Sequence, residues 1–298
     1  MKKIFVIAGE ASGDLHGSNL IQSLKTLSPE PLEIYGIGGD KIQATGALEF
    51  FDLAHFHVTG VTEAIRKIPQ YKKAAKHILA TIQRVRPDAV VLIDNPGFNL
   101  HLASKIHAMG IPIIYYIAPQ LWAWAPKRIY KIKRWIRKVL VVFEFEKKIY
   151  ADEEIDVAWV GHPLKDMAGL TTAGGKKDAN QGLVVSLLPG SRKGELKMLL
   201  DAFQKAARLL SKQFPGISFR LIKASTMPEE RYKNFLEDKE IDVRLVRENA
   251  YEAIRSSDFA IVCSGTATLE CAMLGVPMII SYKGTFISYL LAKKLATV

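Results

Sequence analysis

Cysteine is scarce in this sequence, and the long apolar runs of membrane-spanning proteins are missing from it. Only Cys263 and Cys271 occur among 298 residues. They show no CxxC spacing, so we expect two small buried side chains rather than a disulfide or a metal pair. The apolar run at 4–8 is shorter than the roughly 7–15 residues of a signal-peptide core. No run approaches the roughly 20 residues of a membrane span, so we expect a globular, cytoplasmic protein.

A DxD pair, which could hold Mg²⁺ on a diphosphate, is also missing. The sequence therefore predicts a protein without a metal site or a cofactor. Negative charge on a departing phosphate would then be neutralised by basic side chains and by helix N-termini.

Positive charge, by contrast, is in excess, with a formal net charge of +11. Two stretches, 58–76 and 126–139, combine an apolar helical face with many basic residues. They read either as ordinary helices with solvated lysines or as contacts with an anionic membrane surface. Nucleic acid is disfavoured, because no nucleic-acid-binding motif accompanies the charge. The candidate membrane contacts are Val61, Ile65, Ile68, Lys131, Arg134, Trp135 and Lys138.

Strand-like apolar runs alternate with helix-length periodic segments along almost the whole chain, which is typical of parallel βαβ units. The alternation is interrupted at 165–182, a stretch rich in small and polar residues without apolar periodicity. We therefore predict an α/β protein with two doubly wound, Rossmann-like domains that face a cleft. The predicted domains are 1–164 and 183–298, joined by a linker at 165–182.

The second domain carries two loops that could bind a nucleotide diphosphate. "PGSRKGEL" places glycine, hydroxyl and guanidinium groups between a strand and a helix, where backbone N–H groups can converge on phosphate. "SGTATLE" opens another helix with a carboxylate that could accept ribose hydroxyls. The alternative for the first loop is a capped helix start with Ser191 as the N-cap. The candidate residues are Gly190, Ser191, Arg192, Ser264, Gly265, Thr266 and Glu270.

The first domain instead carries acids at the ends of strands. Glu10 follows the first strand, and Asp94 ends the apolar run "AVVLI". Partial burial raises the pKa of a carboxyl group, which makes its carboxylate a better general base for a sugar hydroxyl. Asp14 is interpreted as a helix cap or first-turn acid, and Asp94 could alternatively bond the N–H groups of its own turn. Residues expected to line the acceptor side are Ser12, Asn99, Gln120, Trp122 and His162.

Five motifs together resemble lipid-A-disaccharide synthases: "GEASGD" at 9–14, "DNPGFN" at 94–99, "PQLWAW" at 119–124, "LLPGSR" at 187–192 and "SGTATLE" at 264–270. The resemblance covers nearly the whole chain. It implies an inverting glycosyltransferase of the two-domain GT-B type. Such an enzyme joins UDP-2,3-diacylglucosamine to 2,3-diacylglucosamine 1-phosphate.

The resemblance also implies roles for single residues and a place in the cell. Asp94 would be the base and Glu10 an essential acid, while Arg192 would contact the diphosphate and Glu270 the ribose. Peripheral attachment to the inner face of the inner membrane follows for such lipid substrates, and a homodimer is considered. The family usually extends beyond the point reached by Val298, so we expect a shortened second domain.

Two other functions stay open at this point. A UDP-N-acetylhexosamine 2-epimerase would share the GT-B architecture and would react without an acceptor. An inactive nucleotide-binding or lipid-binding fragment is the other alternative.

Overall fold

The computed structural model describes residues 1–9, 11–49, 53, 61–123, 125–166, 182–224 and 227–284. These residues form two compact units, one up to Pro163 and one from Leu164 onward. The predicted linker at 165–182 falls largely outside the described residues, so it stays a prediction. Among the described helices, none combines the length and the apolar character needed to cross a bilayer.

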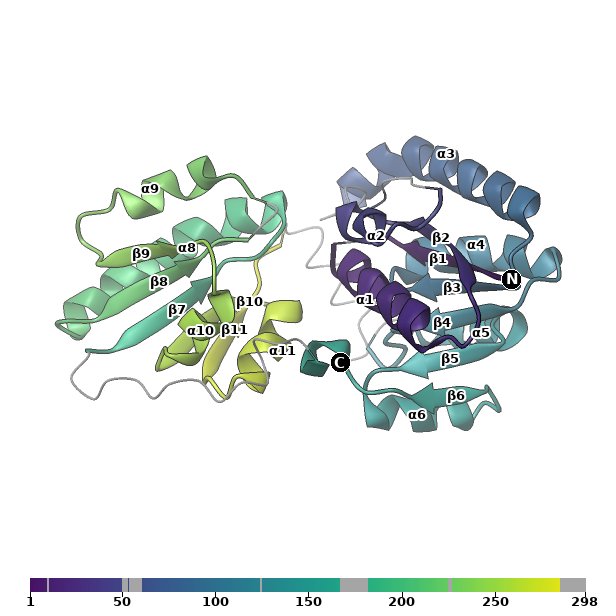
Figure 1. The fold of residues 1–298 in the computed structure, drawn as a ribbon. Helices are drawn as coiled ribbons and strands as arrows, with labels where there is room; N and C mark the ends of the chain where they lie inside the picture. Colours follow the sequence, from purple (N-terminus) through teal and green to yellow (C-terminus); the bar gives the residue numbers. More distant parts are fainter. Residues whose placement is uncertain are drawn as a thin grey trace. The chain divides into compact units, whose positions relative to one another are not determined.

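Unit 1 is built on a six-stranded parallel sheet with the order β2-β1-β3-β4-β5-β6 (Figure 1). The strands are β1 (Lys2–Ala8), β2 (Leu32–Ile37), β3 (Ala89–Ile93), β4 (Ile113–Tyr116), β5 (Lys138–Val141) and β6 (Val157–Trp159). The helices are α1 (Ala11–Leu27), α2 (Asp40–Ala44), α3 (Val61–Val85), α4 (Pro96–Ala108), α5 (Ile129–Trp135) and α6 (Glu144–Ala151), with the 3₁₀ turn η2 (Pro126–Arg128). A second 3₁₀ turn, η3 (Pro163–Asp166), begins at the last residue of unit 1 and continues into unit 2.

Both faces of this sheet are covered, because alternate strand residues enter different apolar clusters. Val6 packs with Ile21 of α1 and Ile42 of α2. Phe5, its neighbour in β1, packs on the other face with Ile78 of α3 and with residues of α4 and α5. A strand that is buried on both sides has no polar face, which is why "AVVLI" reads as a continuous apolar run.

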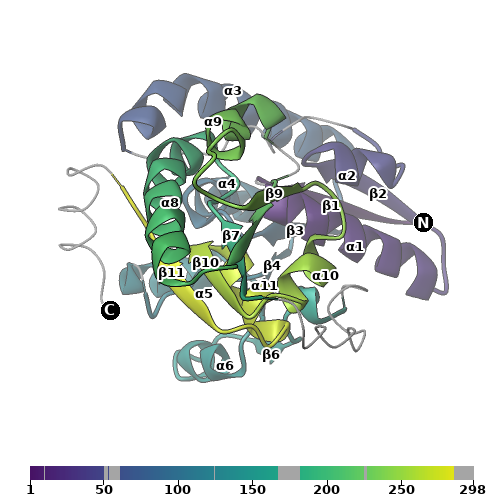
Figure 2. The ribbon, with the colours of Figure 1, turned by 90° about the vertical axis from the view of Figure 1, so that its left-hand side faces the viewer.

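Unit 2 repeats this plan with a five-stranded parallel sheet in the order β11-β10-β7-β8-β9. Figure 2 shows α8 and α9 on one side of the sheet and α10 and α11 on the other, which agrees with the two apolar clusters of this unit. Its elements are β7 (Val184–Leu188), α8 (Lys193–Gln213), β8 (Ser218–Ile222), η4 (Glu229–Tyr232), α9 (Lys233–Leu236), β9 (Val243–Val246), α10 (Ala250–Arg255), β10 (Phe259–Cys263), α11 (Thr266–Met273) and β11 (Met278–Ser281).

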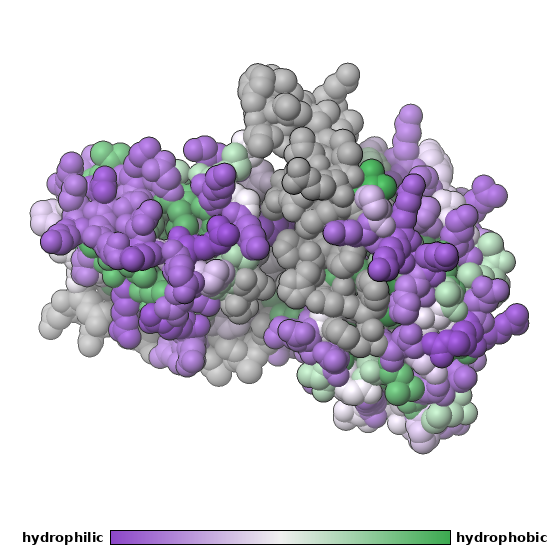
Figure 3. All heavy atoms as spheres, turned by 90° about the horizontal axis from the view of Figure 1, so that it is seen from above, coloured by the Kyte–Doolittle hydropathy of each residue, from purple (hydrophilic) through white to green (hydrophobic). Residues whose placement is uncertain are grey.

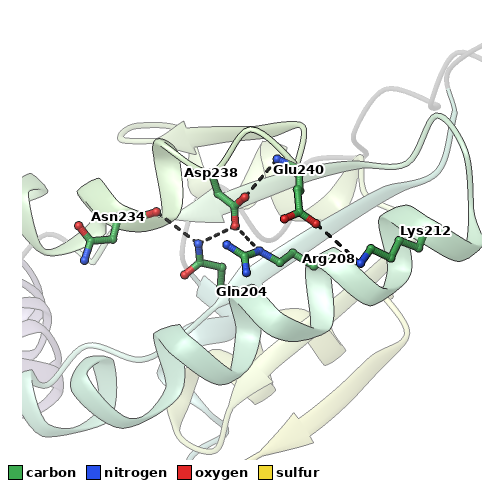
Figure 4. Close-up of polar contacts among 6 residues, drawn as sticks. All are labelled: Gln204, Arg208, Lys212, Asn234, Asp238 and Glu240. Atoms are coloured by element: carbon green, nitrogen blue, oxygen red, sulfur yellow. Dashed lines mark hydrogen bonds and ion pairs between the residues drawn. The ribbon is translucent and has the colours of Figure 1, made fainter.

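A buried carboxylate fixes α9 and the turn after it onto α8. Asp238 Oδ2 accepts hydrogen bonds from Gln204 Nε2 at 2.6 Å and from Arg208 Nε at 2.7 Å (Figure 4). Its other oxygen accepts the Glu240 N–H at 3.1 Å. Charge-assisted bonds of this kind are stronger than neutral ones, so this cluster serves the architecture of unit 2.

The chain order reverses once in each sheet, and each reversal defines a switch point. The first lies between β1 and β3, and the second lies between β7 and β10. Ligands of open parallel sheets bind beyond the carboxyl ends of the strands at such points. The loops that begin at Gly9 and Asp94 lie at the first switch point, and those that begin at Pro189 and Ser264 lie at the second.

The helix predicted over 126–139 is wrong in its extent. The structure forms η2 and then the seven-residue α5, and the chain returns to the sheet at Lys138 as β5. Lys138 pairs in register with Ile114 of β4, so its place is set by the sheet. From Val61 onward, the amphipathic stretch predicted at 58–76 belongs to one 25-residue helix, α3, which runs through Pro69.

Candidate active site

Asp94 occupies the first residue after β3, in an unusual backbone conformation. Asp94 and Asn95 have φ angles of 48° and 43°, both in the left-handed region. The Asp94 N–H donates to the Tyr116 carbonyl at 3.1 Å. The Asp94 carbonyl accepts hydrogen bonds from Tyr115 Oη and from Asn99 Nδ2, each at 2.7 Å. Such strain persists only where neighbouring groups hold it, and it gathers at functional sites.

Asn99 is one of the residues that hold this conformation. Its side chain is 0% exposed, and its Nδ2 also donates to the Ile93 carbonyl at 3.0 Å. Asn99 was predicted on the acceptor side, whereas the structure buries it beneath the loop and bonds it to the backbone of Asp94. Its contribution to the site is therefore to position Asp94.

The loop after β1 meets the Asp94 loop closely. A Cβ placed on Gly9 would lie 2.4 Å from Asn95 Nδ2, so a larger residue at this position would have to displace the Asn95 side chain. Glu10, the other predicted acid, lies outside the described residues. Ser12 is partly exposed in the first turn of α1.

Asp14 is confirmed as a first-turn acid of α1, but the helix that its side chain caps is α2. Its side chain accepts the backbone N–H groups of Gly39 at 2.7 Å, Lys41 at 3.0 Å and Ile42 at 3.0 Å. This carboxylate is buried, and it is fully engaged with the N-terminus of α2.

Two histidines that are far apart in the sequence lie together in unit 1. The rings of His16 and His162 meet edge to face with a centroid distance of 6.2 Å. Burial, together with the neighbouring His162, lowers the pKa of His16 to about 4. Burial also lowers the pKa of His162. Both imidazoles are therefore neutral near pH 7 and can donate or accept one hydrogen bond at each nitrogen.

Two buried side chains, Tyr150 and Glu146, hold the "PQLWAW" loop after β4 by hydrogen bonds. Tyr150 Oη donates to the Pro119 carbonyl at 2.7 Å. Trp122 Nε1 donates to Glu146 Oε1 at 3.3 Å, and burial raises the pKa of Glu146. Gln120 and Trp122 themselves are exposed, as a substrate contact requires.

In unit 2, Glu195 organises the loop after β7. Its Oε2 accepts the N–H groups of Ser191 at 3.1 Å and Arg192 at 3.2 Å, and Arg192 Nη1 donates to its Oε1 at 3.3 Å. A Cβ on Gly190, whose φ is 108°, would lie 2.6 Å from Glu195 Oε2. The alternative of a capped helix start is thus present, with Arg192 rather than Ser191 at the N-cap.

The second loop of unit 2 leads into α11. Its exposed residues are Ser264, Gly265 and Thr266. Glu270 lies one turn further along and accepts a hydrogen bond from Tyr251 Oη at 3.2 Å. Burial raises the pKa of Glu270, while the bond from Tyr251 lowers it.

The predicted membrane contacts separate into exposed and packed residues. Lys131 and Arg134 are exposed on α5, whereas Trp135 packs against the core of unit 1. Lys138 forms an ion pair with Asp156 at 3.0 Å. Ile68 is exposed on α3, and the side chains of Val61 and Ile65 lie outside the described part of the chain. On the face in Figure 3, hydrophilic side chains predominate, with separate smaller hydrophobic patches.

No group of three or more potential metal ligands occurs among the residues that the structure describes. Metal independence therefore stays a prediction. No local pattern indicates the roles of Tyr115 and Tyr251 or the contact between His16 and His162, because each of these residues meets a partner far away in the chain.

Comparison with known proteins identifies the relatives of the chain. A family model described as lipid-A-disaccharide synthetase matches residues 4–298. A lipid-A-disaccharide synthase of Syntrophus aciditrophicus is 39% identical over 303 residues, which cover 100% of this chain and 79% of that protein. Lipid-A-disaccharide synthase 1 of Legionella pneumophila strain Philadelphia 1 is 39% identical, with 97% of this chain and 77% of that protein covered.

Solved structures with the same architecture are more distant in sequence. The UDP-GlcNAc 2-epimerase of Neisseria meningitidis, bound to UDP-GlcNAc, gives a TM-score of 0.62 at 12% identity, with 98% of this chain and 85% of that chain covered. A structure titled "S. aureus MnaA-UDP co-structure" gives 0.66 at 13% identity, with 95% and 80% covered. These structures support the GT-B fold.

Proposed function

Because the chain belongs to the lipid-A-disaccharide synthase family and is therefore a glycosyltransferase with nucleotide-sugar and lipid-linked substrates, we propose that Asp94 is its catalytic base. The observation that carries this proposal is the backbone of Asp94. It is held in a left-handed conformation by Tyr115 and Asn99 at the switch point of unit 1. Two buried donors to the Asp94 carbonyl fix the backbone next to the Cα that carries the proposed base.

The reaction that we propose is a direct displacement. The Asp94 carboxylate takes the proton from the 6-hydroxyl of 2,3-diacylglucosamine 1-phosphate as that oxygen bonds to the anomeric carbon of UDP-2,3-diacylglucosamine. The bond from this carbon to the diphosphate breaks, and UDP leaves with the electron pair. Attack from the opposite side inverts the anomeric centre and gives the β-1,6 disaccharide 1-phosphate. Glu10 stays the second candidate for the base.

Unit 2 would bind the UDP portion without a metal ion. Arg192 and the exposed loop of Ser264, Gly265 and Thr266 follow adjacent strands at the switch point of this unit. A guanidinium beside a helix N-terminus can neutralise a departing diphosphate. Glu270 would accept the ribose hydroxyls, while Tyr251 Oη bonds its Oε1.

Peripheral attachment to an anionic membrane is part of the proposal. It is supported by the exposed Ile68, Lys131 and Arg134 and by the net charge of +11. Cosedimentation with anionic vesicles at low and high salt would test it. The homodimer remains a prediction, which sedimentation equilibrium would test.

The epimerase alternative is not better supported, because an epimerase structure at 12% identity shows the fold alone.

The experiment that tests the base is Asp94→Asn, with Asp88→Asn as the matched control. Asp88 lies at the opposite end of β3, where its Oδ2 accepts the Lys3 N–H at 2.7 Å. We expect Asp94→Asn to bind UDP normally and to lose turnover by about a hundredfold or more. The control should keep its turnover. Unchanged turnover in Asp94→Asn would overturn the assignment.

A further inference from the structure

A continuous series of aromatic rings crosses the carboxyl edge of unit 1. Trp122 meets Phe145 edge to face at 5.5 Å, and Phe145 stacks on Phe143 at 5.8 Å. Phe143 lies 5.6 Å from His162, which in turn meets His16 at 6.2 Å. These five rings, named here the aromatic shelf, come from the loop after β4, the N-cap of α6, α6 itself, the loop after β6 and α1.

The outer rings of the aromatic shelf are exposed and its inner end is buried. Trp122 is 40% exposed and Phe145 is 54% exposed, whereas His16, at the inner end, is 6% exposed. Trp159 is 49% exposed, and its Nε1 donates to the carbonyl of Val142, the residue before Phe143. Single exposed apolar side chains are ordinary, but adjoining aromatic ones mark a binding surface.

The outer rings are fixed in place rather than left free. Glu146, which is buried, accepts both the Trp122 indole N–H and the Phe143 backbone N–H at 3.3 Å. Burying a carboxylate is unfavourable unless hydrogen bonds compensate it. Glu146 therefore holds the exposed Trp122 ring and the backbone of the half-buried Phe143 in place.

The inner end carries polar atoms. His16 Nδ1 is buried and has no hydrogen-bond partner among the residues that the structure describes. Buried polar atoms of native proteins nearly always have a partner, so a water molecule or a polar group of a ligand is expected there. The aromatic shelf thus passes from imidazoles inside to hydrocarbon rings outside.

We propose that the aromatic shelf binds an acyl chain of the lipid-linked acceptor and thereby determines which chain length is accepted. This inference rests on the proposed function. An acylated sugar has the same polarity order as the shelf: its polar ring and amide would lie near His16 and His162, and its hydrocarbon would lie across Phe143, Phe145 and Trp122. The shelf begins on α1, directly after the loop that approaches Asp94.

The test measures binding as a function of chain length. Butyryl and decanoyl forms of diacylglucosamine 1-phosphate, kept below their micelle concentrations, are titrated calorimetrically into the wild-type protein and into Phe145→Ala. The control is Phe214→Ala, which removes a comparably exposed ring at the end of α8 in unit 2. Thermal unfolding of each variant establishes that it is folded.

We expect each methylene on the aromatic shelf to tighten wild-type binding by up to about fourfold. Phe145→Ala should weaken decanoyl binding by about tenfold and butyryl binding by less than about twofold. Phe214→Ala should change neither. Equal losses for both ligands, or no loss for the decanoyl form, would overturn the proposal.

Two further outcomes distinguish acyl-chain binding from nucleobase stacking, and this inference from the proposed function. If Phe145→Ala weakens UDP binding instead, the rings stack on the nucleobase and the acyl assignment is wrong. Formation of disaccharide is measured separately. Its absence in the wild type would overturn the proposed function, while a chain-length effect on binding would still support the aromatic shelf.

Discussion

Replacing Asn99 by alanine tests whether the conformation of Asp94 is held by its neighbours. The change removes two hydrogen bonds, to the carbonyls of Ile93 at 3.0 Å and Asp94 at 2.7 Å. Each such bond contributes about 1 kcal/mol net. The space left by a fully buried side chain adds about another 1 kcal/mol. We therefore expect Asn99→Ala to lower the free energy of unfolding of unit 1 by about 2–4 kcal/mol.

The effect on catalysis follows from the same bonds. The Asp94 carbonyl keeps its bond from Tyr115, so the loop should loosen rather than unfold. A displaced base lowers the turnover of the bound substrate, and a shift of about 1 Å can reduce the rate by about a hundredfold. Because Asn99 is 0% exposed, substrate affinity should hardly change. Tyr115→Phe, which removes one bond to the same carbonyl, should give a smaller loss in the same direction.

The assay combines urea unfolding with steady-state kinetics. At a slope of about 2–3 kcal/mol per molar urea, the transition midpoint of Asn99→Ala should fall by about 1 M. Ser104→Ala is the control on the same helix, since its hydroxyl bonds only the His101 carbonyl. A variant with reduced stability but unchanged kcat would refute the positioning role. A variant unchanged in both would refute the inference that Asn99 holds the loop.

Two other predictions concern His16 in α1 and Gly190 in the loop before α8. The pKa of His16 is about 4 in the folded protein and about 6.5 when unfolded. Between these values the unfolded state binds more protons, so the free energy of unfolding falls as pH drops from about 6.5 to 4, by about 3 kcal/mol. His16→Leu should remove that part of the pH dependence in unfolding measured across this range, and an unchanged profile would contradict it. Gly190 has a φ of 108°, and an added Cβ would lie 2.6 Å from Glu195 Oε2. Gly190→Ala should therefore destabilise unit 2 by about 2 kcal/mol or more in urea unfolding. It should also weaken UDP binding measured by calorimetry. Wild-type stability and affinity in that variant would show that the loop does not need glycine.

The strands and the switch-point loops could be predicted because their signals are local. A strand that is buried on both faces is a short apolar run: the run at 4–8 lies within β1, and "AVVLI" is β3. The ends of these runs were enough to locate the loops of Gly9 and Asp94.

The errors arose where burial in the sheet outweighed a local pattern. The helical pattern of residues 126–139 overlaps an apolar run that is predicted as a strand from Val139 onward. The structure places Val139 in β5, where it pairs with Tyr115 of β4 and Val157 of β6, so the helix ends earlier than its periodicity indicates. The hydrophobic periodicity of a segment does not indicate which distant strand it will pair with.

The partners of the site residues were unpredictable for a related reason. Asn99 is near Asp94 in sequence, but Tyr115 reaches the same carbonyl from the next strand. His16 and His162 come from opposite parts of unit 1 and meet only because the loop after β6 lies near α1. Residue types in a motif indicate chemistry, whereas their orientation depends on the assembled sheet.

Both units contain an acid in the first helix after their first strand, and both acids are engaged internally. Asp14 accepts three N–H groups at the start of α2, and Glu195 accepts those of Ser191 and Arg192. The acidity of "GEASGD" therefore need not repel a ligand at Asp14, because that charge is already compensated by a helix N-terminus. By the same reasoning, a diphosphate in unit 2 cannot use the two N–H groups that Glu195 occupies. It would have to rely on the Arg192 guanidinium and on the loop that begins at Ser264.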